Sequence, residues 1–268
     1  QMCIRDRYSL LPRDTTEDRD AIIEIRAGTG GDEASLFAGD LLRMYQRFAE
    51  ERGWCFEHLE SSPSDVGGFK EVVCRIAGEE VFRFLKYEGG VHRVQRVPAT
   101  ETQGRIHTST ATVAVMPEAE EVDIEIRPED LRIEVCRSGG AGGQHVNKTE
   151  SAVQIWHIPT GVYVRCEEER SQMKNREKGM KILRAKLFEA KKREEAEKYS
   201  AARRNLIGSG GREEKIRTYN FPQNRLTDHR IGYTSHNLDG ILMGQLEDLI
   251  MALQHAEMQE RLAEAGMS

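Results

Sequence analysis

A glycine-rich stretch from Arg137 to Thr149 constrains the fold of this chain more than any other segment. Glycine has no Cβ, so a run of glycines favours left-handed and extended backbone over a regular helix or strand. We therefore expect a protruding loop with the neutral amide of Gln144 at its tip. An amide cannot take up a proton at neutral pH, so the loop is not expected to act by acid-base chemistry. The glycines are Gly139, Gly140, Gly142 and Gly143.

Two other interpretations of this loop stay open beside a role in recognition. An ordinary connection between strands is one, because glycine marks turns in many proteins. A phosphate-binding loop is the other, since residues 142–149 read G-x-x-x-x-N-K-T. Asn147 stands where the P-loop has its second glycine, and residues 151–164 alternate like two strands around a Pro-Thr-Gly turn. The pattern therefore predicts a β-hairpin after the loop and disfavours nucleotide binding.

The distribution of charge indicates a polyanionic partner, although the net charge is −6. Residues 171–206 contain twelve Lys or Arg against five Glu, a local excess of seven positive charges. Positive charge gathered on one element is typical of nucleic-acid binding. A solvated helix face is the alternative for the same pattern. With 268 residues, the chain is long enough for two or three small domains.

Other features exclude several classes of function. No segment approaches the eighteen consecutive apolar residues of a membrane span, so no membrane partner is expected. We expect no metal and no cofactor, because the cysteines lack metal-ligand spacing, and we expect them to be reduced thiols of a cytoplasmic protein. The cysteines are Cys3, Cys55, Cys74, Cys136 and Cys166.

Periodicity predicts a mixture of helices and strands around these features. Residues 90–115 alternate on both sides of a loop that contains Pro98, which predicts a β-hairpin with a polar tip. Residues 117–132 are acidic and predict a surface connection. Strands are expected at 21–26, 55–58, 69–76, 81–87, 131–135 and 229–234, and helices from Ala34, within 171–206 and at 238–263.

The residues around Gln144 resemble a known family. The stretches SGGAGGQHVNKTESAVQIWHIPTGV and ERSQMKNREKG are similar to the GGQ signature of class I peptide chain release factors, and the resemblance extends from about Asp18 to the C-terminus. It implies an α+β fold in which the C-terminal segment completes a codon-reading α/β domain and a small α/β GGQ domain is inserted. The expected divisions are a truncated or foreign remnant at 1–17, the codon-recognition domain at 18–127, the GGQ domain at 128–222 and the C-terminal segment at 223–268.

The resemblance also implies a codon-reading site at the tip of the predicted hairpin. Its Pro98-Ala99-Thr100 is similar to the factors that read UAA and UAG. The Thr100 hydroxyl suits a uracil edge beside an adenine, and His107 offers an aromatic plane for an unstacked base. The family places Gly30 and Glu33 against the first-position uracil. Gln95 and Thr108 can each reverse donor and acceptor, so we expect them to tolerate either purine at the third position.

For the GGQ loop, the resemblance implies hydrolysis of the peptidyl-tRNA ester in the ribosomal peptidyl transferase centre after a stop codon is recognised in the decoding centre. We expect Gly142 and Gly143 to allow close approach, the backbone N–H of Gln144 to stabilise the developing oxyanion, and its side chain to orient water. The family further implies N5-methylation of Gln144 by a glutamine methyltransferase and removal by a GTPase release factor. A codon-independent ribosome rescue hydrolase and a non-catalytic A-site RNA-binding protein stay as alternatives.

Overall fold

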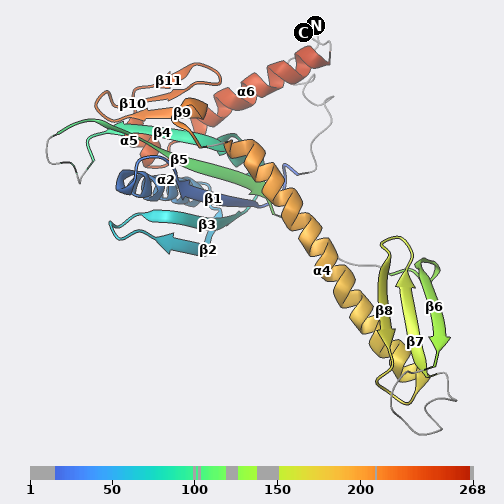
Figure 1. The fold of residues 1–268 in the computed structure, drawn as a ribbon. Coiled ribbons are helices and arrows are strands. Elements are labelled where there is room, and N and C mark those ends of the chain that lie inside the picture. The colour runs from blue at the N-terminus through green and yellow to red at the C-terminus, as the bar shows by residue number, and fades with distance from the viewer. Residues whose placement is uncertain are drawn as a thin grey trace. The chain divides into compact units, whose positions relative to one another are not determined.

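The computed structural model describes residues 16–98, 101, 104–118, 126–137, 151–208 and 210–265. The chain forms two compact units (Figure 1). Unit 1 consists of residues 1–119 together with 202–268, and unit 2 consists of residues 120–201. Unit 2 is therefore inserted into the chain of unit 1, as expected for the α+β fold.

An eight-stranded sheet forms the centre of unit 1, in the order β11-β10-β9-β4-β5-β1-β3-β2. Neighbouring strands are antiparallel except β4 and β9, which are parallel. Strands from the last quarter of the chain thus extend the sheet that the first part begins. The bounds are β1 (Ala21–Ala27), β2 (Cys55–Pro63), β3 (Phe69–Ala77), β4 (Gly90–Arg96), β5 (His107–Pro117), β9 (Lys215–Asn220), β10 (Arg225–Asp228) and β11 (Tyr233–Ser235).

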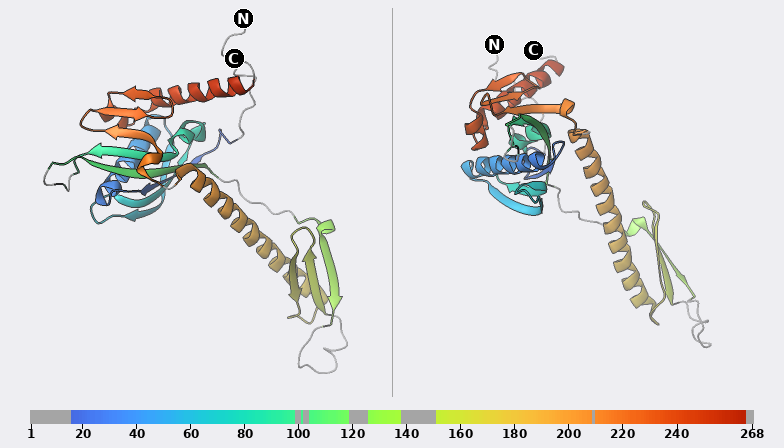
Figure 2. Two further views of the ribbon diagram at one scale, coloured as in Figure 1. Left: turned by 45° about the horizontal axis from the view of Figure 1, so that its top comes forward. Right: turned by 60° about the vertical axis from the view of Figure 1, so that its left-hand side comes forward.

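Helix α2 (Asp32–Glu51) covers the middle of this sheet and contacts β1, β3 and β5 (Figure 2). Its apolar residues recur at helical spacing, so one face is buried while the other carries charge. Phe37, Leu41 and Tyr45 on that face are fully buried. The predicted amphipathic helix is therefore confirmed.

The segment predicted as a strand at 81–87 is helical, so that prediction was wrong. It forms α3 (Val81–Leu85) and the 3-10 helix η1 (Lys86–Glu88). Val81 and Leu85 are both buried, four residues apart on one helical face. A short apolar run fits a strand and a buried helix equally well by periodicity alone, and here tertiary packing decides for the helix.

Two predictions near the C-terminus also need correction. The predicted strand at 229–234 is a turn between β10 and β11, which begins only at Tyr233. The predicted single helix at 238–263 is two helices, α5 (Leu238–Leu242) and α6 (Glu247–Glu264). Gly244 lies between them with φ 106°, a backbone conformation that residues with a side chain rarely adopt. The apolar periodicity continues across this break, which is why it was missed.

Unit 2 contains a three-stranded antiparallel sheet, β6 (Leu131–Cys136), β7 (Ala152–His157) and β8 (Val162–Cys166). The hairpin predicted after the glycine-rich loop is β7 and β8. Helix α4 (Gln172–Ile207) buries Leu183 and Leu187 against this sheet, and its residues from Ala202 belong to unit 1. Short 3-10 helices, η2 (Pro128–Asp130) and η3 (Arg212–Glu214), precede β6 and β9. Strand β9 pairs in unit 1, although we expected residues 128–222 in one domain.

A network of buried polar groups joins η1, β4, β9 and β10. Arg217 is fully buried and donates to both oxygens of Glu88 at 2.6 and 2.9 Å and to Asp228 Oδ2 at 3.2 Å. His92 Nε2 lies 2.8 Å from the carbonyl oxygen of Glu88, so Nε2 carries the proton. His92 Nδ1 then accepts from the Tyr219 hydroxyl at 3.0 Å.

Acidification is expected to destabilise unit 1 through His92. Burial, and secondarily the charge of Arg217, lower the pKa of His92 from 6.5 to about 4, against the opposing attraction of Glu88. Between pH 6.5 and 4, His92 is therefore protonated in the unfolded chain but stays neutral in the folded chain. The free energy of unfolding is highest above pH 6.5 and falls by up to about 3 kcal/mol towards pH 4. Urea unfolding at pH 7.5, 6 and 5 measures this slope. A His92→Gln variant should show a flatter slope, and an equal slope would contradict the assignment.

Candidate functional site

The turn between β1 and α2, which contains Gly30, is fixed to β5 by three hydrogen bonds to one residue. The N–H of Gly28 donates to the Thr110 carbonyl at 2.8 Å, and the Thr110 N–H donates to the Thr29 carbonyl at 2.8 Å. The Thr29 N–H donates to the Thr110 hydroxyl at 2.9 Å. The start of α2 and the second strand of the hairpin are therefore held in one rigid edge.

Gly30 is the tightest point of this edge. It has φ 137°, and a Cβ at this position would overlap the Ser109 side chain and lie 3.0 Å from Ser109 Cα. Only glycine fits here without displacing either the turn or β5. The structure thus brings Gly30, in the turn after β1, directly against Ser109, the residue that follows Thr108 in β5.

Glu33, in the first turn of α2, is 3% exposed and forms an ion pair with Arg96. Arg96 also donates to Asp40 Oδ2 at 2.6 Å, and its guanidinium lies 4.9 Å from the centre of the Phe221 ring. Burial lowers the pKa of Arg96, but Asp40 and Glu33 outweigh it and raise the pKa. Arg96 therefore holds Oε1 of the Glu33 carboxylate, whereas Oε2 is buried and has no hydrogen-bond partner among the described residues.

Gln95 and Thr108 face each other across the β4–β5 pair. The Gln95 carbonyl accepts from the Phe221 N–H at 3.0 Å, and its side-chain Oε1 accepts from Asn220 Nδ2 at 3.3 Å. The structure therefore brings both residues predicted for the third base together. It adds Asn220, which the sequence gave no signal for because it lies 125 residues away from Gln95.

His107, the first residue of β5, is paired with Arg96 at the end of β4. Its side chain is 46% exposed, and its Nε2 lies 2.6 Å from Glu101 Oε2. The Pro98 carbonyl accepts from the Glu101 N–H at 3.0 Å. Pro98 and His107 thus flank the hairpin tip, while the predicted residues Ala99 and Thr100 lie outside the described residues.

Gly142, Gly143 and Gln144 also lie outside the described residues, and Ser151 is the first described residue after them. Asn175 of α4 fixes that point of the chain. Its amide donates to the carbonyls of Ser151 and Glu169 at 2.8 and 2.7 Å and accepts from the Glu169 N–H at 2.9 Å. Asn175 is fully buried, and a lone Asn in a charged helix gave no sequence signal of this role.

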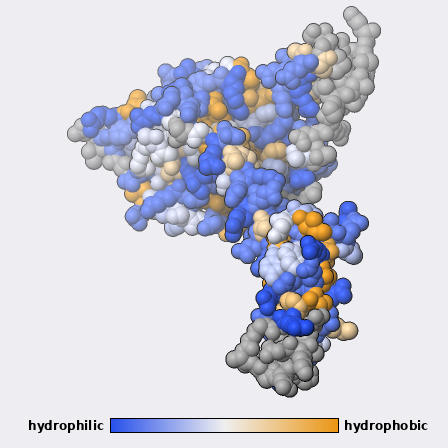
Figure 3. Space-filling view, turned by 45° about the vertical axis from the view of Figure 1, so that its right-hand side comes forward, coloured by the Kyte–Doolittle hydropathy of each residue, from blue (hydrophilic) through white to orange (hydrophobic). Residues whose placement is uncertain are grey.

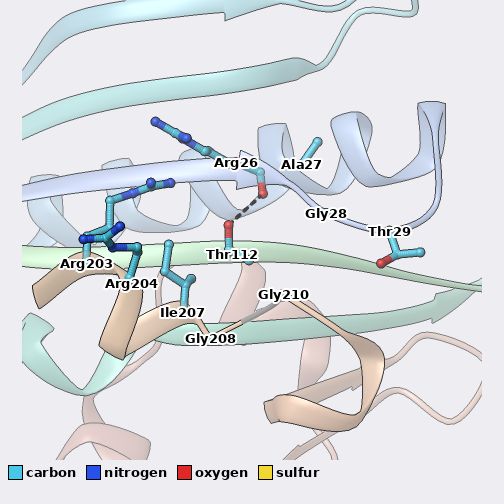
Figure 4. A pocket seen from close by; sticks show the side chains of 10 residues that line it. All are labelled: Arg26, Ala27, Gly28, Thr29, Thr112, Arg203, Arg204, Ile207, Gly208 and Gly210. Atoms are coloured by element: carbon cyan, nitrogen blue, oxygen red, sulfur yellow. Dashed lines mark hydrogen bonds between the residues drawn. The ribbon is translucent and has the colours of Figure 1, made fainter. Parts of the chain in front are cut away.

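A cavity of about 410 Å³ lies beside the β1–α2 turn (Figure 4). Arg26, Arg203 and Arg204 line it, together with Gly28 and Gly210. Arg26 and Arg203 both pair with the buried carboxylate of Glu24, the latter at 2.8 Å. These ion pairs bind the last turn of α4 to β1, so we assign the cavity a structural role. The residues predicted for the site do not line it.

The described surface of unit 1 is polar on the face in Figure 3, where hydrophobic side chains form small separate groups. Among the described residues, the helices are all too short or too polar to cross a bilayer. The same residues contain no group of three or more His, Cys, Asp or Glu placed to hold a metal ion.

Two families match the chain in succession. A PCRF domain matches residues 4–113, and an RF-1 domain matches residues 120–230. The first covers the turn and hairpin that carry the predicted codon-reading residues. The second covers the glycine-rich loop, the sheet of unit 2 and the return of the chain into unit 1.

Individual proteins are similar over nearly the whole chain. Peptide chain release factor 1 of Akkermansia muciniphila is 99% identical over 98% of this chain and 73% of its own length. The protein of the same name from Carboxydothermus hydrogenoformans is 59% identical over 94% of this chain and 71% of its length. Among solved structures, RF2 of Thermus thermophilus matches 92% of this chain and 70% of its own, with 40% identity and a TM-score of 0.55. The chain belongs to the peptide chain release factor 1 family.

Proposed function

We infer that this protein terminates translation: it recognises a stop codon in the ribosomal A site and promotes hydrolysis of the ester that joins the peptide to tRNA. The observation that supports this best is the rigid edge in which Gly30, Gln95 and Thr108 come together on three adjacent elements of unit 1. A rescue hydrolase that ignores the codon has no need of such an edge. The ribosome and peptidyl-tRNA are its partners.

For codon choice, we propose that the protein reads UAA and UAG. Gly30 and the start of α2 would contact the first uracil. The close contact between Gly30 and β5 would give this part of the binding surface a rigid shape. Thr100, with Pro98 and Ala99, would read the first two bases, and His107 would stack on a base. Gln95 and Thr108 would face the third base. The paired Glu33 would act by holding the helix start in place.

For the chemistry, we propose that Gly142, Gly143 and Gln144 act in the peptidyl transferase centre. Water attack on the ester develops negative charge on oxygen, and one fixed N–H donor contributes about 2.7–4 kcal/mol to stabilising such a charge. The Gln144 N–H would supply this donor and its side chain would orient water. Ribosomal RNA completes the site, so the protein alone should be inert. Asn175 supports this proposal because it anchors the chain where it leaves the loop.

Three further expectations belong to the same proposal. A glutamine N5-methyltransferase would modify Gln144, and a GTPase release factor would remove the protein from the ribosome. The protein would be cytoplasmic, where it would encounter both of these partners and the messenger RNA. We also propose that codon recognition resides in unit 1 and hydrolysis in unit 2, with the former completed by the segment after residue 222.

Release of labelled peptide from ribosomes programmed with UAA, UAG, UGA or a sense codon tests this function. We expect release on UAA and UAG alone. Gln144→Ala should lower the rate about tenfold on both codons through loss of the hydrogen bond that orients water, and Thr100→Ala should lower it similarly through loss of a base contact. Matched controls are Gln154→Ala and Thr234→Ala, outside the site, which should keep the rate.

Two outcomes would favour the alternatives. Equal release on every codon would indicate a rescue hydrolase and would mean that the hairpin does not read the codon. Binding to the A site without release on any codon would indicate a non-catalytic RNA-binding protein.

A further inference from the structure

We propose that Asn220 is a positioning residue that sets which hydrogen-bonding group Gln95 presents to the third base of the codon, and thereby the balance between UAA and UAG. The proposal rests on the proposed function, in which Gln95 faces that base. Asn220 itself does not need to touch the codon. It acts on the codon through one side-chain hydrogen bond to Gln95.

The backbones of the two residues are locked together. Gln95 of β4 and Asn220 of β9 are partners in the parallel pair of the sheet. The next residue, Phe221, donates its N–H to the Gln95 carbonyl at 3.0 Å. Because the ring of Phe221 also packs against Arg96, the end of β9 follows any movement of β4. The distance between the two amides is therefore set by the sheet.

The orientation of the Asn220 amide is fixed by a backbone group. Gln223 donates its N–H to Asn220 Oδ1 at 3.1 Å. A backbone N–H can only donate, so the atom that it meets must be the oxygen. The other end of the amide is then the NH₂ group, which can only donate, and it lies 3.3 Å from the Gln95 side chain. Gln95 must meet it with Oε1.

The consequence is that Gln95 turns its own NH₂ group away from Asn220 and offers a donor. Adenine and guanine share the acceptor N7, whereas adenine adds an N6 donor and guanine an O6 acceptor on the same edge. A donor suits N7 of either purine, so one fixed orientation of Gln95 accepts both. Free reversal of Gln95, which the sequence suggested, is not needed; only the Thr108 hydroxyl keeps that freedom.

Asn220→Asp tests this assignment. A carboxylate accepts only, so Asp at this position draws the Gln95 NH₂ group towards itself and turns Oε1 towards the base. Oε1 suits the adenine N6 group and opposes guanine O6. We therefore expect release on UAG to fall about tenfold relative to UAA, as one unmade hydrogen bond predicts. The measured quantity is the ratio of the two release rates, which a general loss of binding or folding leaves unchanged.

Three further variants test whether the shift arises from the orientation of Gln95. Gln95→Glu presents an acceptor by another route and should shift the ratio in the same direction, and combining it with Asn220→Asp should add little, because both act on one interaction. Asn220→Leu removes the constraint without imposing the reverse orientation, so Gln95 can present either group and the ratio should shift towards UAA by less than in Asn220→Asp. Asn237→Asp controls for added charge, since an aspartate still caps α5.

The outcomes separate this proposal from the proposed function. An unchanged ratio in Asn220→Asp, in a protein that still reads UAA and UAG, would overturn the role of Asn220 alone. A ratio shifted equally by Asn220→Leu and Asn220→Asp would also overturn it, because simple loss of packing would then explain both. If the unchanged protein released peptide equally on all codons, the codon-reading function itself would fail.

Discussion

Replacing Arg217 with methionine is expected to lower the free energy of unfolding of unit 1 by about 3–5 kcal/mol. Methionine fills similar space but leaves the carboxylate of Glu88 buried without its charged partner, while Asp228 keeps its ion pair with Arg230 at 2.7 Å. An uncompensated buried charge is far more costly than the loss of an exposed ion pair. Urea unfolding measures the change, followed by the fluorescence of Trp54 in a Trp156→Phe background so that only unit 1 is observed.

The matched control for Arg217→Met is Arg43→Met. Arg43 is 67% exposed and pairs with Asp40 on the surface of α2, so its loss should cost less than about 1 kcal/mol. A similar loss for the two variants would contradict the importance of burial. A stable Arg217→Met protein would mean that Glu88 takes up a proton in the folded state, and its stability would then rise as the pH falls.

Gly30→Ala is expected to reduce release on UAA and UAG by more than tenfold, the largest effect that we predict for function. The added Cβ meets the side chain and backbone of Ser109, so either the helix start or β5 must move. Since these are the edges assigned to the first and third bases, displacing one by even 1 Å should cost as much as losing a contact. Release on the two stop codons and thermal unfolding should be measured together.

A second substitution distinguishes steric overlap from general strain. Ser109→Gly removes the side chain that the new Cβ would meet, so it should restore part of the activity of Gly30→Ala. Gly53→Ala places a Cβ at another positive φ, 69°, with no atom within 4 Å, and should leave release unchanged. Full activity of Gly30→Ala would show that the rigid edge does not read the codon.

The sequence predicted the local elements of unit 1 well where a periodic pattern was long. Helix α2 and the hairpin β4–β5 were predicted because each has many residues in one period. The segment at 81–87 was not, since its five apolar residues in seven positions fit a strand and a buried helix equally well. The break at Gly244 was missed because apolar spacing continues on both sides of it.

The sequence predicted which residues form the site. It did not predict the hydrogen bonds and ion pairs that hold them in place. Gly30, Gln95 and His107 came from the family resemblance, which says nothing about which side chains hold them. Arg96, Asn175 and Asn220 act through hydrogen bonds or ion pairs that depend on the fold, and all three join residues more than 20 positions apart. Polar side chains have no periodicity that would reveal such partners.

The parallel pairing of β4 with β9 has a consequence for the order in which the protein can be made. When residues 1–214 have left the ribosome, β4 still has an open edge and Glu88 is still without Arg217. Unit 2 lies wholly within those residues, so it can fold first. Unit 1 therefore reaches its native state late in its own synthesis, and until then the nascent chain presents a strand edge on which aggregation or a chaperone can act.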